Sequence, residues 1–207
     1  MATTRAVAWQ GLDPDRIEVV RAALGADRLL AEGSSSLPGS LLHYRLVTGS
    51  DWVTRRLRVA VWGDGWARTL RLERAEDGTW RADASRDGMG ILPPPGCADP
   101  SALTGALDCD LGLCPFTNTM PILRHDLVGR RGAPPARPLD LRMAWVSVPD
   151  LAVTVSPQRY RHLRRLDLDS ALVEYRALDS EFRAELVVDG DGLVVDYPDL
   201  ARRIALV

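Results

Sequence analysis

Features that mark secreted and membrane proteins are scarce in this chain. Its 207 residues include three cysteines, Cys97, Cys109 and Cys114, and this odd count argues against a disulfide framework. The first ten residues lack a basic region followed by an apolar one, and no later apolar run is long enough to span a membrane. We therefore expect reduced thiols, a cytoplasmic location and no integral membrane association.

An excess of charge of one sign is also missing. The 26 basic residues are all arginine, 28 residues are acidic, and the two kinds are mixed along the chain to a net charge of -2. No basic face suited to a phosphate backbone is visible, so we expect no nucleic-acid partner. The apolar content of 46% is ordinary for a globular protein, and the length fits one domain covering residues 1–207.

No motif for covalent or metal chemistry stands out. The histidines, His43, His125 and His162, are not accompanied by a GxSxG or comparable nucleophile motif. The cysteines and His125 lack the short CxxC spacing that makes a zinc site recognisable. We expect no catalytic constellation, no bound metal and no cofactor.

What the chain does contain is a repeated pattern of short strands. Between residues 41 and 80, runs of alternating or β-branched residues are separated by turn residues such as Gly63-Asp64-Gly65. In one run Leu57, Val59 and Val61 alternate with polar or small residues, as a half-solvated antiparallel strand requires. Five short runs follow Met143, and Asp189-Gly190-Asp191-Gly192 predicts a hairpin between two of them. The segment 89–137, rich in proline and glycine, is expected to form loops.

The segment from Asp13 to Gly25 is compatible with two structures. A helix would have Asp13 as its N-cap, Pro14 in its first turn, and one apolar face containing Ile17, Val20 and Leu24. A hairpin would use the β-branched residues in one strand and residues 28–31 in a second. Local sequence slightly favours the helix.

A short helix is predicted over residues 117–127. Thr117 or Asn118 could cap it, and Met120, Leu123 and Leu127 would form one apolar stripe. Pro121 is compatible with this helix only in the first turn.

The most distinctive stretch runs from Asp108 to Arg124, with the sequence DCDLGLCPFTNTMPILR. A DxDL segment followed by PFTNT, a hydrophobic residue and PI resembles the hallmark of the putative glycolipid-binding family of bacterial proteins. Further fragments occur in the same order along nearly the whole chain, among them Asp51-Trp52-Val53-Thr54-Arg55, Gly78-Thr79-Trp80 and Gln158-Arg159-Tyr160. Relatives tend to have two arginines after PI, whereas this chain has Leu123-Arg124.

The resemblance implies a fold and a function. Proteins of this family resemble a spiral β-roll, in which a many-stranded antiparallel sheet wraps around a single helix, and they associate as dimers. Residues 117–127 fit the central helix, and Ile17 to Arg21 then become a strand. The implied role, glycolipid binding, rests on similarity of shape.

Several residues are candidates for ligand binding: Trp80, Asp110, Thr117, Asn118, Thr119, Arg124 and Tyr160. Hydroxyl and amide groups of the TNT segment could bind a sugar, with helix capping and loop closure as the alternative. Asp108 and Asp110 would share one face of a strand, which suits acid-base work, but a solvated carboxylate or one paired with Arg124 is the alternative. Aromatic rings with polar tips suit ligands that combine sugar and lipid.

Three hypotheses of function follow. We expect non-catalytic binding of a glycolipid or a similar amphiphile in an apolar cleft. The first alternative is an enzyme acting on a small glycoside or lipid with Asp108, Asp110 or His125 as acid-base groups, which requires two of these side chains to converge in one cleft. The second is a structural protein whose fold builds a homodimer.

Overall fold

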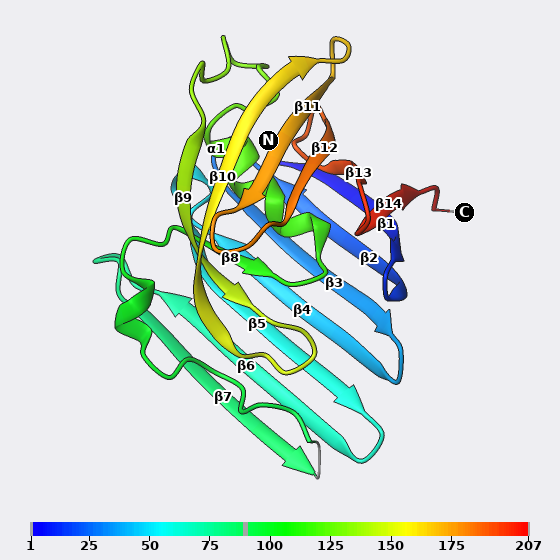
Figure 1. Ribbon diagram of the computed structural model, residues 1–207, viewed down its shortest axis with the longest axis vertical. Helices are drawn as coiled ribbons and strands as arrows, with labels where there is room; N and C mark the ends of the chain where they lie inside the picture. Colours follow the sequence, from blue (N-terminus) through cyan, green and yellow to red (C-terminus); the bar gives the residue numbers. More distant parts are fainter. Residues whose placement is uncertain (1, 89–90, 207) are drawn as a thin grey trace.

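A computed structural model describes residues 2–88 and 91–206 of the protein. Fourteen strands form one sheet in the order β7-β6-β5-β4-β3-β2-β1-β14-β13-β12-β11-β10-β9-β8 (Figure 1). Neighbouring strands pair antiparallel, except that β8 and β9 pair parallel. The sheet is not closed, because β7 and β8 lie at its two edges.

The first half of the sheet is a meander in which each strand pairs with the next. Its inward-facing residues alternate with exposed ones, and tight turns join the strands. The strands are β1 (Thr3–Leu12), β2 (Asp15–Leu24), β3 (Leu29–Leu37), β4 (Ser40–Thr48), β5 (Thr54–Gly63), β6 (Trp66–Arg74) and β7 (Trp80–Gly88).

The second half continues the sheet from the other side of β1, because the last strand pairs antiparallel with the first. Its longest strand, β10, has 13 residues and pairs with both β9 and β11. The strands are β8 (Asp108–Leu111), β9 (Leu139–Val146), β10 (Val153–Arg165), β11 (Ser170–Ala177), β12 (Arg183–Asp189), β13 (Val194–Tyr197) and β14 (Ala201–Ile204).

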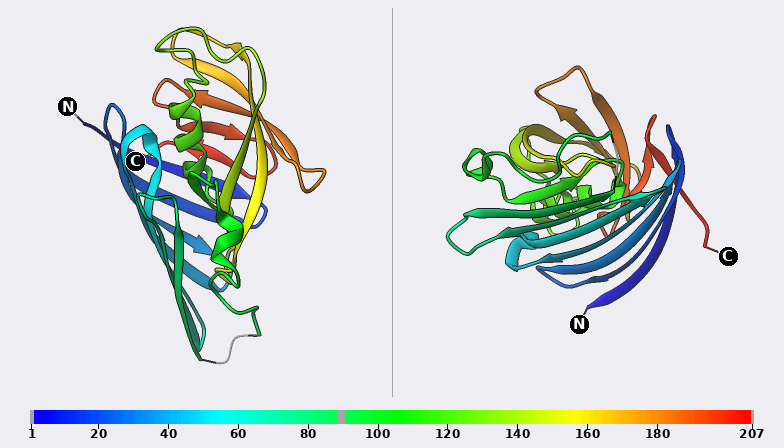
Figure 2. Two further views of the ribbon diagram at one scale, coloured as in Figure 1. Left: turned by 90° about the vertical axis from the view of Figure 1, so that its left-hand side faces the viewer. Right: turned by 90° about the horizontal axis from the view of Figure 1, so that it is seen from below.

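The sheet bends back on itself, so that its two halves face each other across the interior (Figure 2). The only α-helix among the described residues, α1 (Thr119–Arg124), lies between them. The 3-10 helix η3 (Pro115–Asn118) leads directly into α1, and η1 (Ser50–Trp52) and η2 (Pro100–Leu103) lie in connections. This arrangement confirms the predicted sheet wrapped around one helix.

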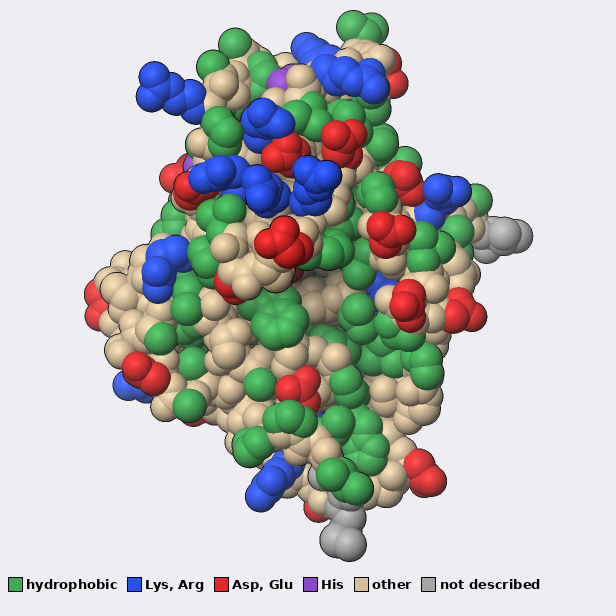
Figure 3. Space-filling view, viewed as in Figure 1, with side chains coloured by type: hydrophobic (Ala, Val, Ile, Leu, Met, Phe, Trp, Pro, Cys, Tyr) green, Lys and Arg blue, Asp and Glu red, His purple; other side chains and the backbone are tan. Residues whose placement is uncertain are grey.

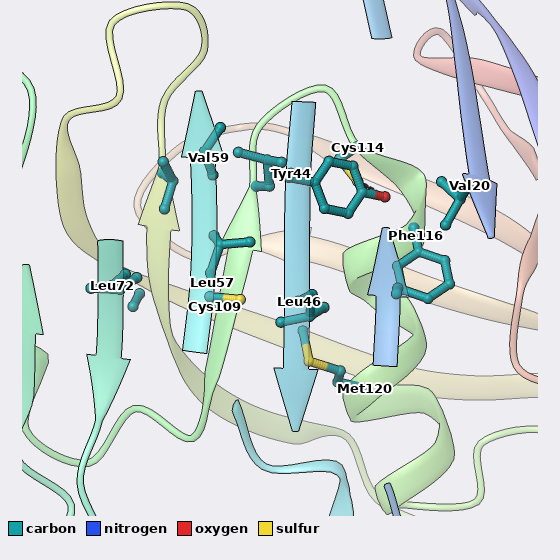
Figure 4. Close-up of a cluster of buried hydrophobic side chains, with 14 of the residues drawn as sticks. Val20, Tyr44, Leu46, Leu57, Val59, Leu72, Cys109, Cys114, Phe116 and Met120 are labelled. Atoms are coloured by element: carbon teal, nitrogen blue, oxygen red, sulfur yellow. Dashed lines mark hydrogen bonds between the residues drawn. The ribbon is translucent and has the colours of Figure 1, made fainter. Parts of the chain in front are cut away.

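Two clusters of buried side chains meet at this helix. One contains Trp9, Tyr44, Phe116 and Met120, and Figure 4 shows its side chains projecting from the strands of the first half toward β8 and the helical segment. The other contains Ile122 from α1 together with residues of β9 to β13. The short helix α1 therefore contributes side chains to both clusters. Burial of these apolar side chains stabilises the bent shape of the sheet.

Within the segment 13–25, residues Asp15–Leu24 form the strand β2, which includes the strand Ile17 to Arg21 that the family resemblance implied, and the helix favoured by the local sequence is wrong. The buried positions of β2 alternate strictly and include Arg16 and Glu18. These two charged residues occupy positions where a half-buried strand normally has apolar ones, so they obscured the two-residue period.

The helical region differs in detail from its prediction. Residues 117–127 begin in η3, continue through α1 and end in turns, and Pro121 is the third residue of α1, within its first turn. Asn118 occupies the N-cap position, but its side chain makes no capping hydrogen bond. The predicted loop segment 89–137 also contains β8 and η2, while residues 89 and 90 lie outside the described part of the chain. No helix of the described residues is long and apolar enough to cross a membrane.

Candidate functional site

A cleft of about 470 Å³ opens between the segment after β8 and the strands β9 to β13. Its volume falls within the usual range of small-molecule sites, roughly 300–1,000 Å³. Its lining includes the aliphatic side chains of Leu111, Leu113, Val148 and Leu200. It also includes aromatic side chains from four different segments: Trp145, Tyr175, Phe182 and Tyr197.

Asp110 provides a carboxylate among the polar groups of this cleft. Its Oδ1 accepts a hydrogen bond from the Thr117 hydroxyl at 2.9 Å, and its Oδ2 accepts one from Nε2 of Gln158 at 2.7 Å. Burial raises the pKa of Asp110, while the hydrogen bonds from Gln158 and Thr117 act in the opposite direction.

Asn118 lies beside this carboxylate in the cleft lining and belongs to the same network. The buried Tyr160 hydroxyl lies 2.8 Å from Oδ1 of Asn118 and 3.3 Å from Oε1 of Gln158. Nδ2 of Asn118 donates to the Pro115 carbonyl at 3.3 Å. The Tyr160 hydroxyl has one proton to donate, and the nearer acceptor is Oδ1 of Asn118. Partners for both its oxygen and its nitrogen therefore fix the orientation of the Asn118 amide, whereas that of Gln158 is fixed by the hydrogen bond from its Nε2 to Asp110.

The structure therefore brings together four of the candidate residues, Asp110, Thr117, Asn118 and Tyr160. Asp110 and Asn118 reach the cleft, whereas Thr117 and Tyr160 are buried behind them. The other three candidates lie elsewhere. Trp80 is buried in the core and donates to the Ala106 carbonyl at 3.1 Å.

Arg124 is bound to the carboxylate of Asp108 by both of its Nη atoms. Asp108 has a side chain only 1% exposed, so this pair is buried, and neither residue belongs to the cleft lining. Thr119 is also fully buried, and its hydroxyl has no hydrogen-bond partner among the described residues. Of the two alternatives to acid-base work, a solvated carboxylate or one paired with Arg124, the structure shows the pairing for Asp108.

His125 follows α1 and is also absent from the cleft lining. Burial, and then the charges of Arg124 and Arg131, lower the pKa of its imidazole. Of the three groups proposed for acid-base work, Asp110 alone lies in the cleft, so the convergence that the enzymatic hypothesis requires does not occur among the described residues.

The turn from Leu111 to Cys114 separates the cleft from a second, much smaller cavity of about 10 Å³. Behind this turn the Glu18 carboxylate accepts hydrogen bonds from the Tyr44 hydroxyl at 3.0 Å and from the Cys114 thiol at 2.9 Å. Arg16 holds the turn itself by donating to the Leu113 carbonyl, at 2.6 Å from Nη2.

Burial raises the pKa of Glu18 to about 7, against the hydrogen bonds from Cys114 and Tyr44 and the charge of Arg16. The hydroxyl of Ser35 lines the same small cavity and has no partner among the described residues. A cavity of this size has room for one water molecule.

Several residues of the cleft lining, and Gln158, which binds Asp110, were missed by sequence reasoning. Gln158 was noticed only as part of a family fragment, although it is a buried polar residue on β10. Its signal is that Ser156, Gln158 and Tyr160 place polar groups at every second position, all on one face of a strand. Tyr197 was likewise noticed only as part of a family fragment, and Tyr175 and Phe182 had no local signal that distinguishes them from core residues.

Fold and cleft together define the class: a mostly β protein with an open, bent sheet and a cleft in its second half. The family model described as putative glycolipid-binding matches residues 6–203, and the chain belongs to that family. A crystal structure of a DUF1089 family protein from Pseudomonas aeruginosa is similar, with a TM-score of 0.65 and 29% sequence identity. The alignment covers 90% of this chain and 92% of that one. Among curated proteins, none matches this chain.

Proposed function

We propose that the protein binds an amphiphile such as a glycolipid, without covalent chemistry, in the cleft between the segment after β8 and β9 to β13. The observation that carries this proposal is the composition of the cleft lining, which combines aliphatic and aromatic side chains with polar groups that include Asp110 and Asn118. Sugar hydroxyls both donate and accept hydrogen bonds, which suits a carboxylate beside an amide. An alkyl chain would lie against the aliphatic and aromatic side chains.

The family to which the chain belongs supports the same proposal through its description. The chemistry of the network supports it too, because Gln158 and Thr117 hold the Asp110 carboxylate in one orientation toward the cleft. Preorganised polar groups of this kind reduce the entropy lost on binding.

Native mass spectrometry of the protein purified from its own cells tests the proposal. We expect an additional mass of lipid size, retained under gentle conditions. The variant Ala177→Trp would fill the cleft, because Ala177 lies in its lining, and should lose this mass. Ala60→Trp is the matched control, since Ala60 is also a partly buried alanine on a strand but lies outside this cleft.

The same spectra report the subunit stoichiometry. The homodimer implied by the family would appear at twice the subunit mass of 22.7 kDa. If the wild-type protein is uniformly empty and also fails to bind lipid extracts, the binding proposal is wrong, and a bare dimer would then favour the structural alternative.

A further inference from the structure

The cleft differs sharply in charge from the rest of the protein. Its described lining contains two acidic residues, Asp110 and Asp179, and no arginine or histidine, although the chain has 26 arginines. Arginines lie instead on the outer surface of β10 to β12, where Arg159, Arg176 and Arg183 occupy directly paired positions. Figure 3 shows basic side chains in a row across this outer surface, flanked by acidic ones. An anionic headgroup would therefore meet only like charge inside the cleft.

Asp110 is a partly buried carboxylate without a counter-ion in the described part of the chain. Two other buried carboxylates of the protein have a cation nearby. Asp108 is bound by Arg124, and the positive charge of Arg16 lowers the pKa of Glu18. Both side-chain partners of Asp110 are neutral, and the described residues form no ion pair with it. The like charge of Asp108 raises the pKa of Asp110, in the same direction as burial. An unpaired carboxylate in such surroundings costs free energy that a cation would offset.

The remaining hydrogen-bonding capacity of Asp110 is available to a ligand. A carboxylate has about four acceptor sites, and Thr117 and Gln158 occupy one on each oxygen. The aromatic side chains of the same cleft favour a cation as well, because the faces of such rings carry partial negative charge. The carboxylate and the aromatic rings therefore both attract a positively charged group of a ligand.

We propose that the headgroup of the amphiphile carries an ammonium group, as in an amino sugar or an alkylamine, and that this group pairs with Asp110. The inference rests on the binding function proposed above and specifies its ligand class. It excludes phosphate- and sulfate-bearing headgroups from the cleft.

Four probes with the same octyl chain test this inference by calorimetric titration, below the concentrations at which they form micelles. They are the neutral glucoside, its 2-amino-2-deoxy analogue, the N-acetyl derivative of that analogue, and octylamine. At a pH where the amines are protonated, the amino glucoside should bind about tenfold more tightly than its N-acetyl derivative, because only its ammonium group can form a charge-assisted hydrogen bond with Asp110; tenfold corresponds to about 1.4 kcal/mol. Octylamine separates the two sources of the ammonium group: binding as tight as that of the amino glucoside would show that the sugar is dispensable.

Asp110→Asn should abolish the preference for the amino probe, and its melting temperature shows whether the variant is folded. Asp179→Asn is the matched control, because it removes the same charge from an exposed position of the lining and should keep the preference. Equal binding of amino, N-acetyl and neutral probes to the wild type would overturn the inference and leave the proposed function intact. Failure of every probe to bind would contradict both. A folded Asp110→Asn variant that keeps the preference for the amino probe would overturn the assignment of selectivity to Asp110.

Discussion

Replacing the buried Glu18 by glutamine should change how stability depends on pH. Glu18 is 2% exposed, and burial raises its pKa from the ordinary value of 4.5 to about 7. The unfolded chain releases this proton near pH 4.5, whereas the folded protein retains it until about pH 7. The contribution of Glu18 to stability is thus fully present below pH 4.5 and is lost as the pH rises through about 7.

The magnitude follows from the same two values. One pKa unit corresponds to about 1.4 kcal/mol, so the change from 4.5 to about 7 corresponds to a loss of about 3 kcal/mol. Glutamine has the shape of the protonated carboxyl group, and its oxygen can accept the hydrogen bonds from Tyr44 and Cys114. Because the amide does not ionise, Glu18→Gln should not show this loss.

Urea denaturation of both proteins between pH 4 and pH 8.5 measures the effect, with the exposed Glu181→Gln as control. The free energy of unfolding of the wild type should fall by about 3 kcal/mol relative to Glu18→Gln as the pH rises, and should then level off above pH 7. The control should follow the wild type. Parallel curves for wild type and Glu18→Gln, or a wild type that gains stability with rising pH relative to this variant, would refute the reasoning.

Three further outcomes are expected. Arg124→Met leaves the Asp108 carboxylate buried without its cation and should cost about 3–5 kcal/mol in urea denaturation; the double variant with Asp108→Asn should recover a large part, and no recovery would contradict the pairing. Tyr160→Phe removes the donor to the buried Asn118 amide and should cost about 1–3 kcal/mol, seen as a lower melting temperature; an unchanged melting temperature would argue against the network. Phe182→Ala removes a side chain of the cleft lining that is 43% exposed. This variant should weaken amphiphile binding severalfold and lower the free energy of unfolding by less than about 1 kcal/mol. Unaltered binding would show that the ligand binds elsewhere.

The local alternation of apolar and polar residues, together with turn residues, was sufficient to predict many strands of the sheet. The alternation of Leu57, Val59 and Val61 predicted one buried face of β5, and all three are at most 3% exposed. The hairpin at residues 189–192 was predicted equally well, because glycine and aspartate mark the turn between β12 and β13. Such signals are local, so they identify strands without giving the order of those strands in the sheet.

The residues of the cleft could be predicted only in part. Asp110, Thr117 and Asn118 were recognised from one distinctive stretch of sequence, and they do meet in one network with Tyr160. Trp80 and Arg124 came from the same resemblance, yet the structure places them in the core and in a buried ion pair. A motif identifies residues that a fold uses, but only the packing shows whether a side chain reaches a cavity.

The position of Asp110 depends on a contact that lies far from the cleft in sequence. β8 has four residues, so its own pairing with β9 specifies its register weakly, and a shift by one residue would exchange Asp110 with Cys109. Thr54 at the start of β5 prevents this shift: its hydroxyl accepts a hydrogen bond from the backbone nitrogen of Cys109 at 3.0 Å, and its own backbone nitrogen donates to the Leu107 carbonyl at 3.0 Å. Because these bonds hold Cys109 toward the core, Asp110 must project to the opposite side of β8. There, Gln158 and Thr117 donate hydrogen bonds to its carboxylate. The first half of the sheet thereby determines which side chain of β8 the second half can present to a ligand.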